Sequence, residues 1–192
     1  MPLPVARGAL AVMTTNRVLY LLGSAAPPVL GVGAVIKRAQ AVGWDVCLGL
    51  TPTAARWLGD RLTELEALTG HPVRSRYKLP GEPDTWPPAD AVILAPATFN
   101  TLNQWALGIT DKFVVGLVAE AIGKGLPLIT MPCVNTALIR HRQFDCSVAT
   151  LRAMGVRVLY GEDGFVPDQP GEGRPEDYPW HLALEAAASA HG

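Results

Sequence analysis

The chain has 192 residues and a mass of 20.4 kDa, which suits one well-buried domain, because two domains of half this length would each have a marginal core. Hydrophobic residues make up 49% of the chain and charged residues only 17%, below the roughly 25% of ordinary soluble domains. The formal net charge of −1 provides no general basic field, which excludes nucleic acid and membrane surfaces as expected partners. A small molecule or another protein is the expected partner.

The three cysteines, Cys47, Cys133 and Cys146, are an odd number without C-x-x-C spacing, so neither a disulfide framework nor a zinc site is indicated. No metal site is expected, and the pattern favours the reducing cytoplasm. Residues 1–16 are interpreted as a flexible N-terminal tail, and residues 17–192 as a single domain. No segment approaches the ~18 consecutive apolar residues of a membrane span.

The predicted elements alternate between short apolar strands and amphipathic helices. Strands are expected at residues 18–22, 45–50, 91–95, 126–131 and 156–160, with a brief additional strand at 73–77. Helices are expected at residues 29–42 and 180–190, and two more begin near residues 54 and 137. A further long helical region, ending at residue 123, is expected to be broken near Gly108. The alternation predicts a three-layer α/β fold, with a parallel sheet covered by helices on both faces and a flap loop at about 161–179.

Small and polar residues follow four of these strands, where ligands bind in open α/β sheets. The four segments are Gly23-Ser24, Thr51-Pro-Thr53, Pro96-Ala-Thr-Phe-Asn-Thr101 and Pro132-Cys-Val-Asn135. Small residues let the backbone approach a ligand, hydroxyls suit a phosphate, and an Asn amide offers a donor and an acceptor. This pattern suits a phosphorylated planar cofactor. It contains no P-loop motif, and Gly31-Val-Gly33 is not a complete dinucleotide fingerprint.

The segment Ala95-Pro-Ala-Thr-Phe-Asn-Thr101, continued by Asn103-Gln-Trp-Ala-Leu-Gly-Ile-Thr-Asp111, resembles the PASANT motif and following helix of a known family. That family is the homo-oligomeric flavin-containing cysteine decarboxylases, which include the phosphopantothenoylcysteine and the lantibiotic peptidyl-cysteine decarboxylases. The resemblance extends over roughly residues 18–174. It implies a Rossmann-like, flavodoxin-type flavoprotein that assembles as a homotrimer or dodecamer and binds FMN between its subunits.

The resemblance also implies roles for individual residues. The implied cofactor-binding residues are Gly23, Ser24, Thr51, Thr53, Pro96, Ala97, Thr98, Asn100 and Thr101. Asn100 would lie beside the flavin ring and the substrate carboxylate. Pro132-Cys-Val-Asn135 resembles the family's substrate motif PxMNxxMW, so Asn100 and Asn135 are the candidate catalytic residues.

Two departures from the family pattern concern catalysis. Family decarboxylases carry a histidine eight residues before the Asp that corresponds to Asp90, where this chain has Glu82. The flap cysteine found in part of the family is also absent, since Pro167 or Asp168 occupies that region. Flavin binding is therefore better supported by the sequence than decarboxylation.

Simpler interpretations stand beside the functional ones. Ser24, Thr51, Thr53, Thr98 and Asn100 each follow a strand at which a helix must be capped in any case. Asn135 is alternatively a turn residue after a proline. His71 is expected at the surface, His141 on a solvated basic face, and Cys47 and Cys146 in the core.

The expected function is that of an FMN-binding flavoprotein that acts on a small-molecule or peptide substrate with a carboxylate or a thiol. Flavin-dependent oxidative decarboxylation, or related redox chemistry, is the expected reaction if the protein is an enzyme. The first alternative is a redox or regulatory flavoprotein without decarboxylase activity. A flavin prenyltransferase is the second alternative.

Overall fold

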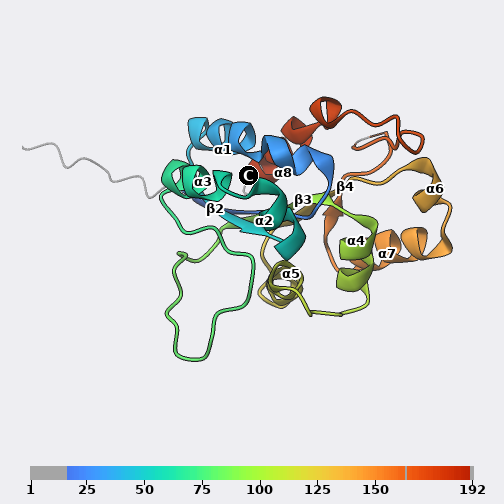
Figure 1. Cartoon of the computed structure of the whole chain (residues 1–192). Helices are drawn as coiled ribbons and strands as arrows, with labels where there is room; N and C mark the ends of the chain where they lie inside the picture. Colours follow the sequence, from blue (N-terminus) through green and yellow to red (C-terminus); the bar gives the residue numbers. More distant parts are fainter. Residues whose placement is uncertain (1–16, 163, 191–192) are drawn as a thin grey trace, which may run out of the picture.

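The computed structural model describes residues 17–162 and 164–190, so the predicted tail at residues 1–16 lies outside the described residues. Five parallel strands form one sheet in the order β2-β1-β3-β4-β5 (Figure 1). The strands are β1 (Arg17–Gly23), β2 (Trp44–Leu50), β3 (Ala91–Ala97), β4 (Leu128–Pro132) and β5 (Arg157–Val158). The predicted parallel sheet is therefore confirmed.

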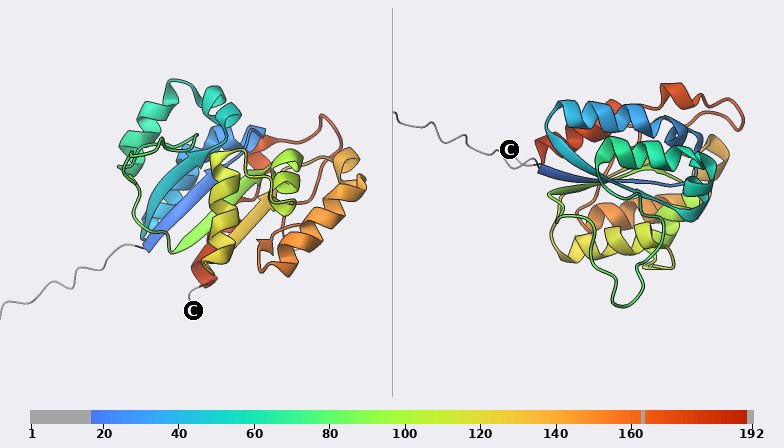
Figure 2. Two further views of the ribbon diagram at one scale, coloured as in Figure 1. Left: turned by 90° about the horizontal axis from the view of Figure 1, so that it is seen from below. Right: turned by 60° about the vertical axis from the view of Figure 1, so that its left-hand side comes forward.

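Helices cover both faces of the sheet (Figure 2). On one face lie α1 (Val32–Ala41) and α8 (Trp180–Ser189), and on the other α4 (Phe99–Ala106), α5 (Phe113–Gly123) and α7 (Arg142–Ala153). The remaining helices are η1 (Pro27–Gly31), α2 (Pro52–Leu58), α3 (Arg61–Thr69), α6 (Thr136–Ile139) and η2 (Pro175–Asp177). This arrangement confirms the three-layer Rossmann-like architecture.

The centre of the sheet is almost entirely apolar because it is covered on both sides. Every residue of β3 is buried, as are the residues of β4. The brief strand expected at 73–77 is reduced to a single bridge between Arg74 and Gly49. Prolines at positions 72 and 80 flank this segment, and proline removes a backbone donor that a longer strand would need.

Residues 70–90 form a long segment without a helix, which lies below the sheet and beside α5 in Figure 1. Its Tyr77 hydroxyl donates to Thr110 O (2.7 Å) and lies directly on Gly116 of α5, where a Cβ atom would come within 1.9 Å of it. The Trp86 ring packs against Tyr20 and Phe113, with centroids 4.9 and 5.8 Å apart. The segment thus replaces a helix as the cover of β1 on this face.

The burial of the cysteines differs in part from the prediction. Cys47 is buried in β2, as expected, but Cys146 is exposed on α7. The expectation for Cys146 was wrong because α7 turns Phe144, Ser147, Val148 and Leu151 towards the core, which leaves position 146 on the outer face. Within residues 17–162 and 164–190, no helix has the length and apolarity needed to cross a membrane.

Candidate functional site

Backbone hydrogen bonds join the carboxyl ends of four strands into one row. They run from Thr51 N to Gly23 O (2.9 Å), from Ser24 N to Pro96 O (3.0 Å) and from Cys133 N to Ala97 O (2.9 Å). The row brings together the turns that the sequence singled out after β1, β2, β3 and β4. Because the strands are parallel, all four turns lie at the same edge of the sheet.

Ser24 joins the turns after β1 and β3. Its buried hydroxyl donates to Pro96 O (2.7 Å) and accepts from Thr98 N (2.8 Å). Gly23 permits this close packing, since a Cβ atom at its position would come within 3.0 Å of Val29 Cγ2. Ser24 therefore shapes the edge, with its one donor already engaged by the protein.

Two threonines of the predicted site cap helices. Thr51 Oγ1 accepts from Ala54 N at the start of α2, and Thr98 Oγ1 accepts from Thr101 N at the start of α4 (both 3.3 Å). The Thr98 and Thr101 hydroxyls also share a hydrogen bond of 2.9 Å. The capping interpretation therefore holds for both threonines, and it orients the backbone N–H groups of these turns towards the edge.

Thr53 lies in the first turn of α2, where its hydroxyl accepts from Arg56 Nη2 (3.0 Å). This places an exposed guanidinium beside the predicted phosphate-binding threonine. Arg56 is not among the residues predicted from the sequence, although its position three residues after Thr53 puts both on one face of a helix.

Asn100 lies exposed in the first turn of α4 and makes no side-chain hydrogen bond to any described residue. The preceding Phe99 packs against the His141 ring, with centroids 5.5 Å apart and the rings nearly perpendicular. His141 therefore stands beside this turn as well as on the basic surface that the sequence predicted. Its Nδ1 accepts from Gln143 N (3.1 Å), so the ring caps the start of α7.

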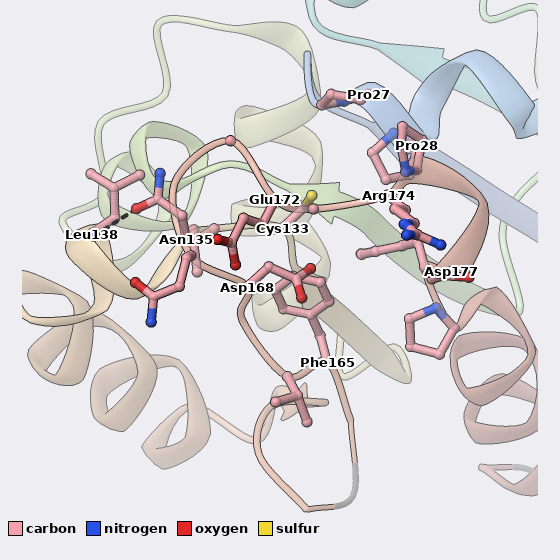
Figure 3. Close-up of a pocket in the computed structure, with 18 of the residues that line it drawn as sticks. Pro27, Pro28, Cys133, Asn135, Leu138, Phe165, Asp168, Glu172, Arg174 and Asp177 are labelled. Atoms are coloured by element: carbon pink, nitrogen blue, oxygen red, sulfur yellow. Dashed lines mark hydrogen bonds between the residues drawn. The ribbon is translucent and has the colours of Figure 1, made fainter.

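A cavity of about 640 Å³ opens beside this edge (Figure 3). Pro27 and Pro28 of η1 form one wall, Cys133, Asn135 and Leu138 another, and residues 164–179 of the predicted flap the rest. Asn135 is the predicted site residue that lines it. Its Oδ1 accepts from Leu138 N (3.0 Å), so Asn135 caps α6 while its NH₂ group makes no hydrogen bond to a described residue.

The predicted cofactor-binding residues are not in the lining of this cavity. They lie in the adjoining turns at the same edge, which separates the predicted site into two neighbouring parts. One part is the row of strand ends with Asn100, and the other is the cavity with Asn135.

The predicted flap is fastened at two places. Thr136 N donates to Asp168 O (2.9 Å), and the Thr136 hydroxyl donates to Gln169 Oε1 (2.8 Å). Near the other end, the buried Tyr178 hydroxyl donates to Met131 O of β4 (2.6 Å). These contacts hold the segment over the end of β4 as a wall of the cavity.

Two weak acids of the cavity wall are held in their neutral forms. Burial, reinforced by the charge of Asp168, raises the pKa of the Cys133 thiol to about 11. Burial also raises the pKa of Tyr178 well above its usual range. At neutral pH, Cys133 is thus a thiol rather than a reactive thiolate.

His71, and Glu82 at the position of the family histidine, both lie away from this site. His71 Nε2 is 2.8 Å from Asp45 Oδ1 near the start of β2, at the opposite end of that strand from Thr51. The Glu82 carboxylate accepts from Leu79 N (2.8 Å) in the exposed segment 70–90, which Figure 1 places away from the flap. Within one chain, neither residue belongs to the site.

Comparisons with known proteins agree with this architecture. Phosphopantothenoylcysteine decarboxylase of Mus musculus is 32% identical over 106 residues, which are 54% of this chain and 52% of that protein. The chain therefore spans about half the length of this relative.

Solved structures with a similar fold include the FMN-dependent cysteine decarboxylase TvaF from thioviridamide biosynthesis, with a TM-score of 0.67 and 22% identity. That comparison covers 90% of this chain and 98% of TvaF. The peptidyl-cysteine decarboxylase EpiD has a TM-score of 0.67 and 17% identity, covering 89% of this chain and 98% of EpiD. At these identities, the likeness establishes the fold.

The profile of the family described as Flavoprotein matches residues 10–178, which include all five strands and the flap as far as Tyr178. The match covers the edge of the sheet at which the predicted site residues meet. The chain belongs to the Flavoprotein family.

Proposed function

We propose that the protein binds FMN along the row of strand ends and catalyses oxidative decarboxylation of a substrate that ends in cysteine. The observation that carries the proposal is the junction of two features at one edge: the small-residue row with the free Asn100 amide, and the flap-covered cavity with Asn135. The mouse relative is a phosphopantothenoylcysteine decarboxylase, and TvaF is an FMN-dependent cysteine decarboxylase. Their names support both halves of the proposal.

The residues at the edge suit FMN. The exposed Asn100 amide, which has no hydrogen bond to a described residue, offers hydrogen bonds to a ring edge rich in donors and acceptors. Thr53 with Arg56 supplies a hydroxyl and a positive charge for a phosphate. When bound, FMN would accept the two electrons that the substrate loses.

The protein's own side chains would bind the substrate, orient it and exclude water from it. Loss of CO₂, one proton and two electrons converts a C-terminal cysteine carboxylate into an enethiol. The Asn135 NH₂ group and the Arg174 guanidinium are proposed donors to the substrate, with Arg174 as the partner of the departing carboxylate. The flap and Leu138 would exclude water around it.

A flavoprotein without decarboxylase activity is the second candidate. The observation that favours it is the lack of a histidine among the described residues that line the cavity. His141 lies beside the turn of Asn100 and is not among the residues that line the cavity.

We also propose that the protein is a cytoplasmic homo-oligomer. Cys47, Cys133 and Cys146 are all free, which suits a reducing compartment. Four large apolar side chains are exposed on segment 70–90 and the α4–α5 loop, and we call them the apolar surface: Tyr77 (49%), Leu79 (67%), Leu107 (60%) and Ile109 (47%). The hydrogen bond from Tyr77 to Thr110 O holds the two segments beside each other, and apolar side chains gathered on a surface mark protein interfaces.

Titration of the purified protein with FMN tests flavin binding. Assays of CO₂ release from two substrates then test decarboxylation. The substrates are a cysteine-terminated peptide and phosphopantothenoylcysteine. We expect a yellow complex, release of CO₂ and bleaching of the flavin. A protein that stays colourless in excess FMN refutes the proposal, whereas a yellow protein that releases no CO₂ from either substrate supports the second candidate.

A further inference from the structure

The predicted flap carries a charge very different from that of the rest of the chain. Residues 161–179 contain six acidic residues and one basic residue, Arg174, which gives a net charge of −5. The other residues, with 11 acidic and 15 basic side chains, have a net charge of +4. Although the whole chain is nearly neutral, the segment that forms the cavity wall is strongly negative.

Three of these acidic side chains line the cavity, namely Asp168, Glu172 and Asp177. Asp168 and Glu172 lie towards Asn135, whereas Asp177 lies with Arg174 towards Pro28 (Figure 3). None of the three carboxylates makes an ion pair or a side-chain hydrogen bond with a described residue, and Arg174 is the single positive side chain in the lining. The negative charge of the cavity is therefore only partly compensated by the protein.

The charge acts inside the cavity as well as on its rim. Asp168 is the second cause, after burial, of the raised pKa of Cys133, whose thiol lies in the opposite wall. A carboxylate that disfavours one negative charge at this position disfavours any other anionic group placed there. The same field attracts a positive group and increases its rate of entry.

We propose that the substrate of this cavity is a basic peptide, with lysine or arginine side chains close to its C-terminal cysteine, and not a phosphorylated small molecule. This inference rests on the proposed function and names the substrate class for it. The carboxylate of the cysteine has Arg174 as its partner on the Pro28 side of the cavity, which leaves Asp168 and Glu172 on the Asn135 side for the cationic side chains. A phosphate group would instead face uncompensated carboxylates.

The test uses the FMN-loaded protein and three hexapeptides that end in cysteine. The two residues before the cysteine are both lysine in the first peptide, both serine in the second and both glutamate in the third. Phosphopantothenoylcysteine is the fourth probe. Dissociation constants are measured by calorimetry at about 50 mM and about 500 mM salt, between which the screening length falls severalfold. We expect the lysine peptide to bind roughly tenfold more tightly than the serine peptide at low salt, and the difference to shrink at high salt.

Amide substitutions identify the residues responsible. The combined variant Asp168→Asn, Glu172→Gln, Asp177→Asn removes three charges without changing side-chain size, and we expect it to bind the lysine and serine peptides equally. A matched control, Glu64→Gln, Asp145→Asn, Glu185→Gln, removes three exposed charges outside the cavity lining and is expected to keep the preference.

Equal binding of the lysine and serine peptides to the unmodified protein overturns the inference, as does tighter binding of phosphopantothenoylcysteine. Both results leave the proposed function standing if FMN is bound and CO₂ is released. Peptide binding is also measured without FMN. A charge preference in a protein that never binds FMN supports the inference about the cavity and refutes the proposed function.

Discussion

At the scale of single residues, Asn100 differs from its neighbours in the predicted site. Ser24, Thr51 and Thr98 use their hydroxyls to hold turns and helix ends together, whereas the Asn100 amide has no such bond among the described residues. A ligand at this edge therefore finds Asn100 available. Its substitution separates binding from folding better than substitution of the other three.

We predict that Asn100→Ala weakens FMN binding by roughly tenfold, which corresponds to the loss of about one hydrogen bond. The melting temperature should not fall, because alanine is the better helix former at an exposed position. Fluorescence titration with FMN and thermal denaturation measure the two effects. Unchanged FMN affinity would show that Asn100 has no part in flavin binding.

Cys133 offers a chemical probe of the cavity. With a pKa of about 11, its thiolate fraction at pH 8 is on the order of 10⁻³, and it rises about tenfold per pH unit. We predict that iodoacetamide labels the exposed Cys146 before Cys133, and that labelling of Cys133 accelerates up to about pH 11. Mass spectrometry of labelled peptides measures both rates.

The Asp168→Asn variant provides the control for this prediction. It removes the negative charge that contributes to the raised pKa, so labelling of Cys133 should become faster at any fixed pH below 11. Slower or equal labelling would mean that Asp168 does not influence the cavity wall.

At the scale of elements, the ends of the helices build the site. Four helices are capped at their N-termini by a side chain that accepts a backbone hydrogen bond. The caps of α2, α4, α6 and α7 are Thr51, Thr98, Asn135 and His141, respectively. Thr51 and Thr98, which the sequence suggested either as ligands or as caps, are thus observed as caps, whereas the capping roles of Asn135 and His141 were not predicted. The role as caps does not oppose ligand binding, since it fixes the turns that a ligand would contact.

The flap depends on its attachment to β4. We predict that Tyr178→Phe lowers the free energy of unfolding by about 1–2 kcal/mol, because Met131 O loses its buried donor. Cleavage of the flap by a protease should also become faster. Denaturant unfolding and limited proteolysis measure these changes.

Tyr160→Phe is the matched control, because its ring packs against Phe144 and its hydroxyl makes no hydrogen bond to a described residue. This variant is expected to retain nearly all the stability of the unmodified protein. If both substitutions have the same effect, the bond from Tyr178 to Met131 does not hold the flap.

At the scale of the whole molecule, buried weak acids limit stability at high pH. Burial raises the pKa of Tyr20 and of Cys47 to about 12, and it raises that of Tyr178 further above its usual range. The folded state therefore retains protons that the unfolded chain releases from about pH 9 upward. The stabilisation is complete below this pH and is lost as the pH rises through the folded pKa values.

We predict a constant free energy of unfolding between pH 7 and about pH 9, followed by a steady fall. Tyr178 contributes at most about 1.4 kcal/mol per pH unit to this fall, and Tyr178→Phe should make the decline shallower. Urea titrations at a series of pH values measure it. A stability that rises above pH 9 would contradict the assignment of these buried groups.

The apolar surface leads to a prediction about assembly. We expect light scattering to give a mass that is a multiple of 20.4 kDa, and Leu79→Asp with Ile109→Asp to lower it towards that of one chain. Val42→Asp is the control, because Val42 is also exposed but lies after α1, away from this surface. A monomeric unmodified protein would contradict the proposed assembly.

The sequence by itself determined the order and class of the elements. Strands buried on both faces are continuous apolar runs, and glycine and proline mark their ends, so β1 to β4 were predicted within a few residues. The motif around Asn100 also indicated the edge at which the site residues meet. The sheet order of β2-β1-β3-β4-β5 then placed the turns after β1, β2, β3 and β4 together.

Only the tertiary structure decided how the polar groups of that edge are used. The Ser24 hydroxyl bonds to backbone atoms more than 70 positions away, and local sequence patterns contain no record of such a partner. The same reason applies to the cavity, whose walls come from η1, the end of β4 and the flap. Composition made the flap acidic, but folding directed three of its carboxylates and one guanidinium into a common space, because the flap is bonded to Thr136 and Met131.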